Sequence, residues 1–204
     1  MPLHAHHLVI GGFRQNRRRL AGVDRVLDAL NVFRMPGVRV QLFKWDADWA
    51  GEAEFILRHK ADADPIVCIY AYSWGFGHGA VRLAEELARR GLRVAGLVGC
   101  DGVYRDHFLL RRWRALWQNS RIDLPGSIDR ADVRLFVQAN SLLRGHRVFD
   151  AHGAEIRAER IERVVINGNR FSDVADHYNI DESARWIDEC RCMARKFHPE
   201  AFPT

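Results

Sequence analysis

Short apolar runs alternate with amphipathic helical patterns along this chain. The apolar runs, which predict β-strands, lie at residues 8–10, 38–43, 65–72, 92–99, 133–137 and 161–166. Apolar residues at helical spacing follow the first run, and other helical patterns lie at 50–59, 80–90, within 104–119, and at 180–195. This alternation predicts a single domain over residues 1–204 with an α/β fold: a three-layer α/β/α sandwich around a mostly parallel sheet of about six strands.

The composition is that of a globular chain with one core. The chain has 204 residues, of which 48% are hydrophobic. No apolar segment reaches the length of a membrane span, and the first residues lack the basic and apolar regions of a secretory signal. We therefore expect a cytoplasmic protein with no membrane span.

The net charge is +5, and nearly all of the positive charge is arginine. The arginine clusters at 17–19 and 111–114 could contact phosphates, but they equally suit solvated helix faces. No zinc-finger, RNA-binding or helix-turn-helix pattern accompanies them. We favour solvated faces and expect no nucleic-acid partner.

The cysteines do not form a disulfide framework. Cys68 and Cys100 lie in apolar strand runs and are expected in the core, whereas Cys190 and Cys192 are two apart on a helix and point to different sides. The other candidate metal ligands are three histidines near the N-terminus: His4, His6 and His7. Because no carboxylate or cysteine lies near them in sequence, we interpret them as an exposed tail and expect no metal site.

The most informative segment is an apolar run that ends at Ser73. Tyr72 precedes this serine, Trp74 and Gly75 follow it, and a helical pattern begins shortly afterwards. A strand, a sharp turn with serine at its apex and a helix form the nucleophile elbow of hydrolases, although the usual first glycine is Ala71 here. The alternative is a buried strand that leads into a helix with Ser73 as its N-cap.

A serine nucleophile needs a base, and His177 is the best placed histidine. It follows the last predicted strand and precedes the last helix. The other histidines lie within helices, in connections of uncertain position or, for His198, near a C-terminus that we expect to fray. The alternative for His177 is a surface histidine near a helix start. Asp181, four residues further on, is a candidate cap for the final helix.

The acid that orients the base is predicted at Asp101. Reactive groups collect at the carboxyl ends of parallel strands, and the fourth strand ends at this residue. The fifth strand leads into residues 138–140, which contain no carboxylate. Asp101 with Gly102 is also a common turn pair, and both roles are compatible.

Two backbone N–H groups are needed to bind the oxyanion of an acyl-transfer reaction. One is expected from Trp74, directly after the nucleophile, and the other from Gly12 or Phe13 in the loop after the first strand. Glycines in that loop let the backbone approach a substrate closely. The alternative is a tight turn between strand and helix.

The chain resembles the α/β-hydrolase superfamily, in particular compact lipase-like and thioesterase-like members from bacteria and phages. The resemblance rests on residues 11–13, 72–75, the helix at 80–90, 97–104 and the segment 177–181, which is similar to an H-x-x-M-D ending with Ile180 in place of methionine. It implies a Ser73–His177–Asp101 triad and no metal or organic cofactor. No long insertion is present to serve as a lid, which favours a small acyl substrate.

The function expected from these residues is a serine hydrolase that cleaves a small acyl ester or thioester through an acyl-enzyme. An apolar substrate pocket is expected from Phe76, Tyr104 and Trp113, each of which equally suits a core position. The alternative function is a catalytically inactive binding or scaffold protein that keeps the hydrolase shape. The sequence assigns no oligomeric state.

Overall fold

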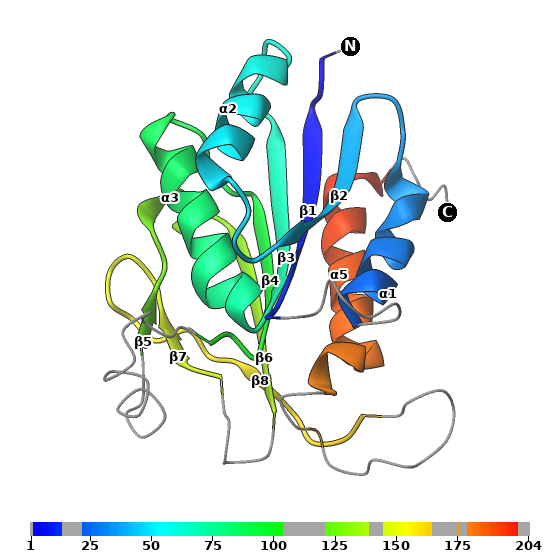
Figure 1. Ribbon diagram of the computed structural model, residues 1–204, viewed down its shortest axis with the longest axis vertical. Coiled ribbons are helices and arrows are strands. Elements are labelled where there is room, and N and C mark those ends of the chain that lie inside the picture. The colour runs from blue at the N-terminus through cyan, green and yellow to red at the C-terminus, as the bar shows by residue number, and fades with distance from the viewer. Residues whose placement is uncertain are drawn as a thin grey trace.

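A computed structural model of the chain describes residues 2–13, 22–103, 121–138, 145–164, 175 and 179–199. Its main feature is a central sheet of six parallel strands (Figure 1). The strands are β1 (Ala5–Gly11), β2 (Val38–Lys44), β3 (Ile66–Tyr72), β4 (Gly96–Cys100), β6 (Asp132–Gln138) and β8 (Glu159–Ile161). They lie in the order β2-β1-β3-β4-β6-β8, and their carboxyl ends meet at one edge, at the bottom of Figure 1.

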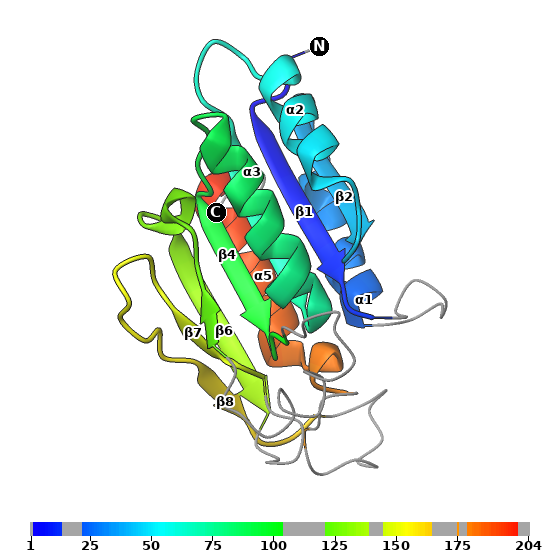
Figure 2. The same cartoon turned by 60° about the vertical axis from the view of Figure 1, so that its left-hand side comes forward.

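Helices cover both faces of this sheet. The helices α1 (Gly22–Leu30) and α5 (Ala184–Phe197) pack on one face, and α2 (Trp49–His59) and α3 (Val81–Arg89) pack on the other (Figure 2). The predicted α/β fold and its three α/β/α layers are therefore confirmed.

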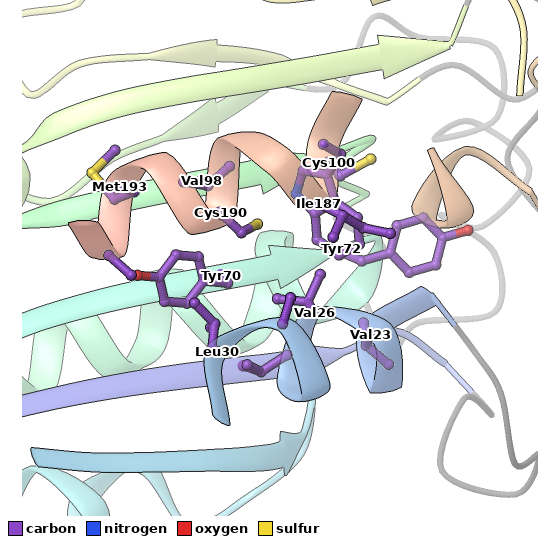
Figure 3. Packing of buried hydrophobic residues seen from close by; sticks show 14 of the residues in the cluster. Val23, Val26, Leu30, Tyr70, Tyr72, Val98, Cys100, Ile187, Cys190 and Met193 are labelled. Atoms are coloured by element: carbon purple, nitrogen blue, oxygen red, sulfur yellow. The ribbon is translucent and has the colours of Figure 1, made fainter. Parts of the chain in front are cut away.

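The core has two parts, one on each face of the sheet. Between the sheet and the α1–α5 layer, side chains of Val26 and Leu30 from α1 and Ile187 and Cys190 from α5 meet Tyr70 from β3 (Figure 3). A second apolar cluster lies between the sheet and the α2–α3 layer. Both faces of the central strands are thus covered, which explains why those strands are continuous apolar runs in the sequence.

Several element boundaries differ from the prediction. The first strand begins at residue 5 rather than 8, the fourth begins at 96 rather than 92, and the sixth, expected at 161–166, shares only Ile161 with β8. The final helix begins at Ala184, after a short 3₁₀ turn. Two strands were not predicted: β5 (Arg121–Asp123) and β7 (Arg147–Phe149) pair in a separate parallel sheet. Each is only three residues long, too short for a recognisable alternation.

The prediction of an exposed histidine tail holds for His4, which is exposed, but is wrong for the other two histidines. His6 and His7 are fully buried in β1, which lies between β2 and β3. His7 Nδ1 lies 2.8 Å from the Tyr70 hydroxyl. His198 does not fray either: it is 1% exposed, and its ring centroid lies 5.0 Å from that of His7. A neutral imidazole is apolar enough to fill such positions, and the residue type alone does not reveal this.

Burial keeps His6 and His7 uncharged. Desolvation, with a smaller contribution from Arg39, lowers the pKa of His6 to about 4. Desolvation, with a smaller contribution from His198, lowers the pKa of His7 to about 3. Charging either ring within the fold would therefore cost free energy.

The cysteines lie as predicted. Cys68, Cys100 and Cys190 are buried, Cys192 is exposed, and all four thiols are free. Burial raises the pKa of the Cys68 thiol to about 12. Within the described ranges, no helix combines the length and apolar character needed to cross a bilayer.

Candidate active site

The strand order reverses direction between β1 and β3. The chain leaves β1 through α1 toward β2 on one side, and leaves β3 through α3 toward β4 on the other. At such a switch point the loops after two neighbouring strands diverge, and ligands of wound α/β sheets bind in the resulting crevice. The loop after β1 begins with Gly12, and the loop after β3 begins with Ser73.

Ser73 occupies a strained turn at this point. Its backbone φ angle is 54°, in the left-handed region that residues other than glycine rarely adopt. Its N–H donates to the Cys100 carbonyl at 3.0 Å, and its carbonyl accepts from the N–H groups of Gly77 at 3.1 Å and Val103 at 3.0 Å. An N-cap serine has extended backbone angles, so the N-cap interpretation of Ser73 does not fit.

Close backbone contacts bring the loop after β1 against this turn. A Cβ atom at Gly12 would lie 2.9 Å from the Cβ of Ser73, and one at Gly75 would lie 2.4 Å from the carbonyl oxygen of Ile10. Glycine is therefore required at both positions. Trp74 begins the helical segment that follows, where the first backbone N–H groups have no partner within the helix.

That helical segment opens with a π-helical stretch, Gly75–Ala80, before α3. π-Helical turns are rare in proteins, and those that do occur often lie at functional sites. The stretch holds three glycines, and a Cβ at Gly79 would lie 2.8 Å from the Ile10 side chain. The start of the helix therefore packs directly against the end of β1.

Asp101 occupies a second left-handed turn, with a φ angle of 45°. Its N–H donates to the Phe136 carbonyl at 2.7 Å. Its fully buried carboxylate accepts from Gly145 N–H at 2.8 Å on Oδ1 and from Gln138 Nε2 at 3.2 Å on Oδ2. The position at the end of the fourth strand is as predicted. The sequence did not predict a role for Gln138, because residues 138–140 were searched only for a carboxylate and not for a side chain that donates to one.

The two strained turns form one unit. The strands β3 and β4 pair in register up to Tyr72 and Cys100, so both chains turn at the same level. The Ser73 N–H then bonds to Cys100 O, directly before Asp101, and Val103 N–H bonds back to Ser73 O. Ser73 and Asp101 are the two non-glycine residues with positive φ in the part of the chain that the structure describes.

Three predicted site residues, His177, Tyr104 and Trp113, lie outside the described residues. Residues on either side of position 177 are attached to the same edge of the sheet. Ala175 N–H donates to the carbonyl of Glu162, just past β8, and the Asp181 carboxylate accepts from Gly22 N–H at the start of α1 at 3.0 Å. Asp181 therefore caps α1, and its predicted role at the final helix is wrong.

Aromatic side chains gather on the β1–β2 side of Ser73. The ring of Trp74 lies 4.8 Å from those of Phe13 and Trp45, measured between centroids, and 5.3 Å from that of His78. Phe13 is 51% exposed, so its ring lies at the surface beside Trp74. Trp45 and His78 were not predicted as site residues, because their proximity arises only from the convergence of three loops.

On the opposite side of Ser73, toward β6, the expected pocket residue Phe76 borders a cavity of about 550 Å³. Its side chain is 1% exposed, so it also packs in the core. The two interpretations offered for Phe76 from sequence are thus compatible.

No model of a known protein family matches the chain, and no curated protein sequence matches it. The features that distinguish this edge of the sheet are geometric. A serine and a buried carboxylate lie on linked left-handed turns, and a helix start and a glycine loop converge on the serine. This arrangement can present a hydroxyl, orient an imidazole and stabilise a developing negative charge.

Proposed function

We propose that this protein is a serine hydrolase that cleaves a small acyl ester or thioester, with Ser73 as nucleophile, His177 as base and Asp101 as the acid that orients the base. The observation that carries the proposal is the pair of linked left-handed turns at Ser73 and Asp101. Each such conformation costs about 1–3 kcal/mol and persists where surrounding structure enforces it, most often at functional sites.

In the first step, Ser73 Oγ forms a bond to the acyl carbonyl carbon while its proton passes to His177. The tetrahedral intermediate then expels the alcohol or thiol, which takes the proton from His177 as it leaves. The Asp101 carboxylate, held by Gly145 and Gln138, would fix the imidazole tautomer and stabilise the imidazolium.

The carbonyl oxygen becomes negatively charged in this step and needs donors in place. The N–H of Trp74 at the helix start is one candidate donor, and the loop at Gly12 and Phe13 supplies the other. Removing one such donor typically costs about 3 kcal/mol of transition-state stabilisation. Water, deprotonated by His177, then attacks the acyl-enzyme, and the carboxylic acid is released as Ser73 regains its proton.

The first test is hydrolysis of p-nitrophenyl butyrate by the wild type and by Ser73→Ala. We expect the variant to lose at least about 10³-fold in kcat/KM, because no other group supplies the nucleophile. Ser183→Ala is the matched control, since Ser183 is also buried and its side chain makes no capping hydrogen bond to α5. Equal activity of Ser73→Ala and the wild type would refute the proposal.

The alternative, a binding or scaffold protein without catalysis, predicts a different result. A scaffold would hydrolyse neither p-nitrophenyl esters nor acyl thioesters above the background rate, and Ser73→Ala would then change nothing. His177→Gln provides a second check, because the hydrolase proposal expects a loss comparable to that of Ser73→Ala.

A further inference from the structure

A cavity of about 550 Å³ lies beside the carboxyl ends of β4 and β6. Strand β7 and the segment at 155–158 form one wall of it. Its volume is in the range of small-molecule sites, and apolar surface predominates in its lining. Side chains that supply this apolar surface are Phe76, Leu135, Val148, Ile156 and Ala158.

The inner end of the cavity is built from the residues that hold the two strained turns. Gly102 lies directly after Asp101, and Gln138 and Gly145 donate to the Asp101 carboxylate. The N–H of Phe76 donates to the Ser73 carbonyl at 3.1 Å. Ser73 and Asp101 do not themselves line the cavity, but their hydrogen-bond partners do, so the cavity lies beside the candidate active site, on the side of β4 and β6.

Glycines give the cavity its shape. A Cβ atom at Gly102 would lie 2.0 Å from the Phe76 ring, and one at Gly99 would lie 2.7 Å from the same ring. Because both positions are glycine, the ring packs directly against the backbone after and within β4. A larger residue at either position would push the ring outward, toward the cavity.

The charged groups around the cavity lie at its exposed rim. Arg147 and Glu155 form an ion pair there, with a hydrogen bond from Nε to Oε1 of 2.8 Å, and Arg157 and Arg160, which also line the cavity, are exposed. Leu135 and Val148 are buried further in. An apolar interior with a charged rim suits a ligand with an apolar chain, because burial of a charge without a partner is costly.

We propose that this cavity binds the acyl chain of the substrate, and that the preferred chain is unbranched, apolar and longer than acetyl. The inference rests on the proposed hydrolase function and adds to it the substrate class. It places the chain on the Asp101 side of Ser73, so the alcohol or thiol group leaves on the side of Phe13, Trp45 and Trp74.

The experiment measures binding and turnover separately. Binding of acetate, butyrate, hexanoate and octanoate to Ser73→Ala is followed by calorimetry, with an expected gain of about fourfold in affinity for each added methylene group that is buried. Ala158→Trp fills the cavity and should abolish this gain. Ala50→Trp, at an exposed position of α2, is the matched control and should retain it.

Turnover of p-nitrophenyl esters is then compared in Ala158→Trp and the wild type. We expect kcat/KM for the octanoate ester to fall at least tenfold relative to that for the acetate ester. Ile156→Trp, at a second wall of the cavity, repeats the measurement if the first variant does not fold.

The outcomes separate the two proposals. Chain-length-dependent binding without ester hydrolysis would support the cavity site and overturn the hydrolase. Ester hydrolysis with the same chain-length profile in Ala158→Trp, Ile156→Trp and the wild type would support the hydrolase and overturn the cavity site.

Discussion

The two ends of the central sheet accommodate buried polar side chains in different ways. At the amino end, the imidazoles of His6 and His7 are buried in ordinary extended strand, and they are tolerated because they stay neutral. At the carboxyl end, Ser73 and Asp101 lie on strained left-handed turns, with donors gathered around the carboxylate. Burial of a titratable group therefore does not by itself mark a functional site. Strain combined with converging hydrogen-bond donors is the more specific sign.

The largest effect expected from this comparison is acid destabilisation from the amino end. The unfolded chain protonates its histidines below pH 6.5, whereas folded His6 and His7 resist protonation until about pH 4 and about pH 3. Stability is therefore full above pH 6.5 and falls as the pH drops, by up to about 1.4 kcal/mol per pH unit for each histidine. Urea unfolding at pH 7, 6 and 5 measures the slope of the free energy of unfolding against pH.

Two variants show which histidine causes the change in the free energy of unfolding with pH. His6→Leu should reduce it, because the His6 ring nitrogens make no hydrogen bond with the described part of the chain. His59→Gln, at an exposed histidine on α2 that contributes to the low His6 pKa less than burial does, should reduce the slope much less than His6→Leu. A free energy of unfolding that stays constant from pH 7 to pH 5 would contradict this account of the amino end.

The next largest effect concerns the backbone contact at the carboxyl end. Gly75→Ala places a methyl group against the Ile10 carbonyl and should destabilise the fold by about 2 kcal/mol, with a loss of hydrolysis as the helix start moves away from β1. Gly126→Ala is the control, since the nearest atom to its new Cβ would be 4.0 Å away. Equal stability of the two variants in urea would show that the contact is not tight.

The smallest effect isolates the strain at the nucleophile. Ser73→Gly should be more stable than Ser73→Ala by about 1 kcal/mol, because glycine adopts a φ of 54° without steric cost. Both variants should be inactive. At Ser183, where φ is −61°, the glycine variant should not be more stable than the alanine variant. Thermal unfolding of the four variants checks this, and an alanine variant at 73 as stable as the glycine variant would argue against strain.

Much of the architecture could be predicted from the sequence, because segments with the period of a strand alternate with segments with the period of a helix. In sheets of this kind, functional groups also collect at the carboxyl ends of the parallel strands. The turn at Ser73 and the placement of Asp101 after the fourth strand both followed from that rule. The burial of His6 and His7 could not be predicted, since a neutral histidine in a central strand has no distinct pattern.

Contacts between distant segments were equally hidden from sequence. The donation from Gln138 to Asp101 and the capping of α1 by Asp181 depend on which loops meet in space. Gly145 likewise looks like any loop glycine, although a Cβ there would lie 2.8 Å from the Asp101 carboxylate. Such contacts follow from the topology of the sheet rather than from local spacing.

The most direct test of the account is labelling with a fluorophosphonate probe, followed by peptide mapping in a mass spectrometer. The account predicts a single phosphonylated serine at position 73 in the folded protein, with labelling absent in Ser73→Ala and unchanged in Ser183→Ala. Folded protein that takes up no label, or a label that maps to another serine, would contradict it.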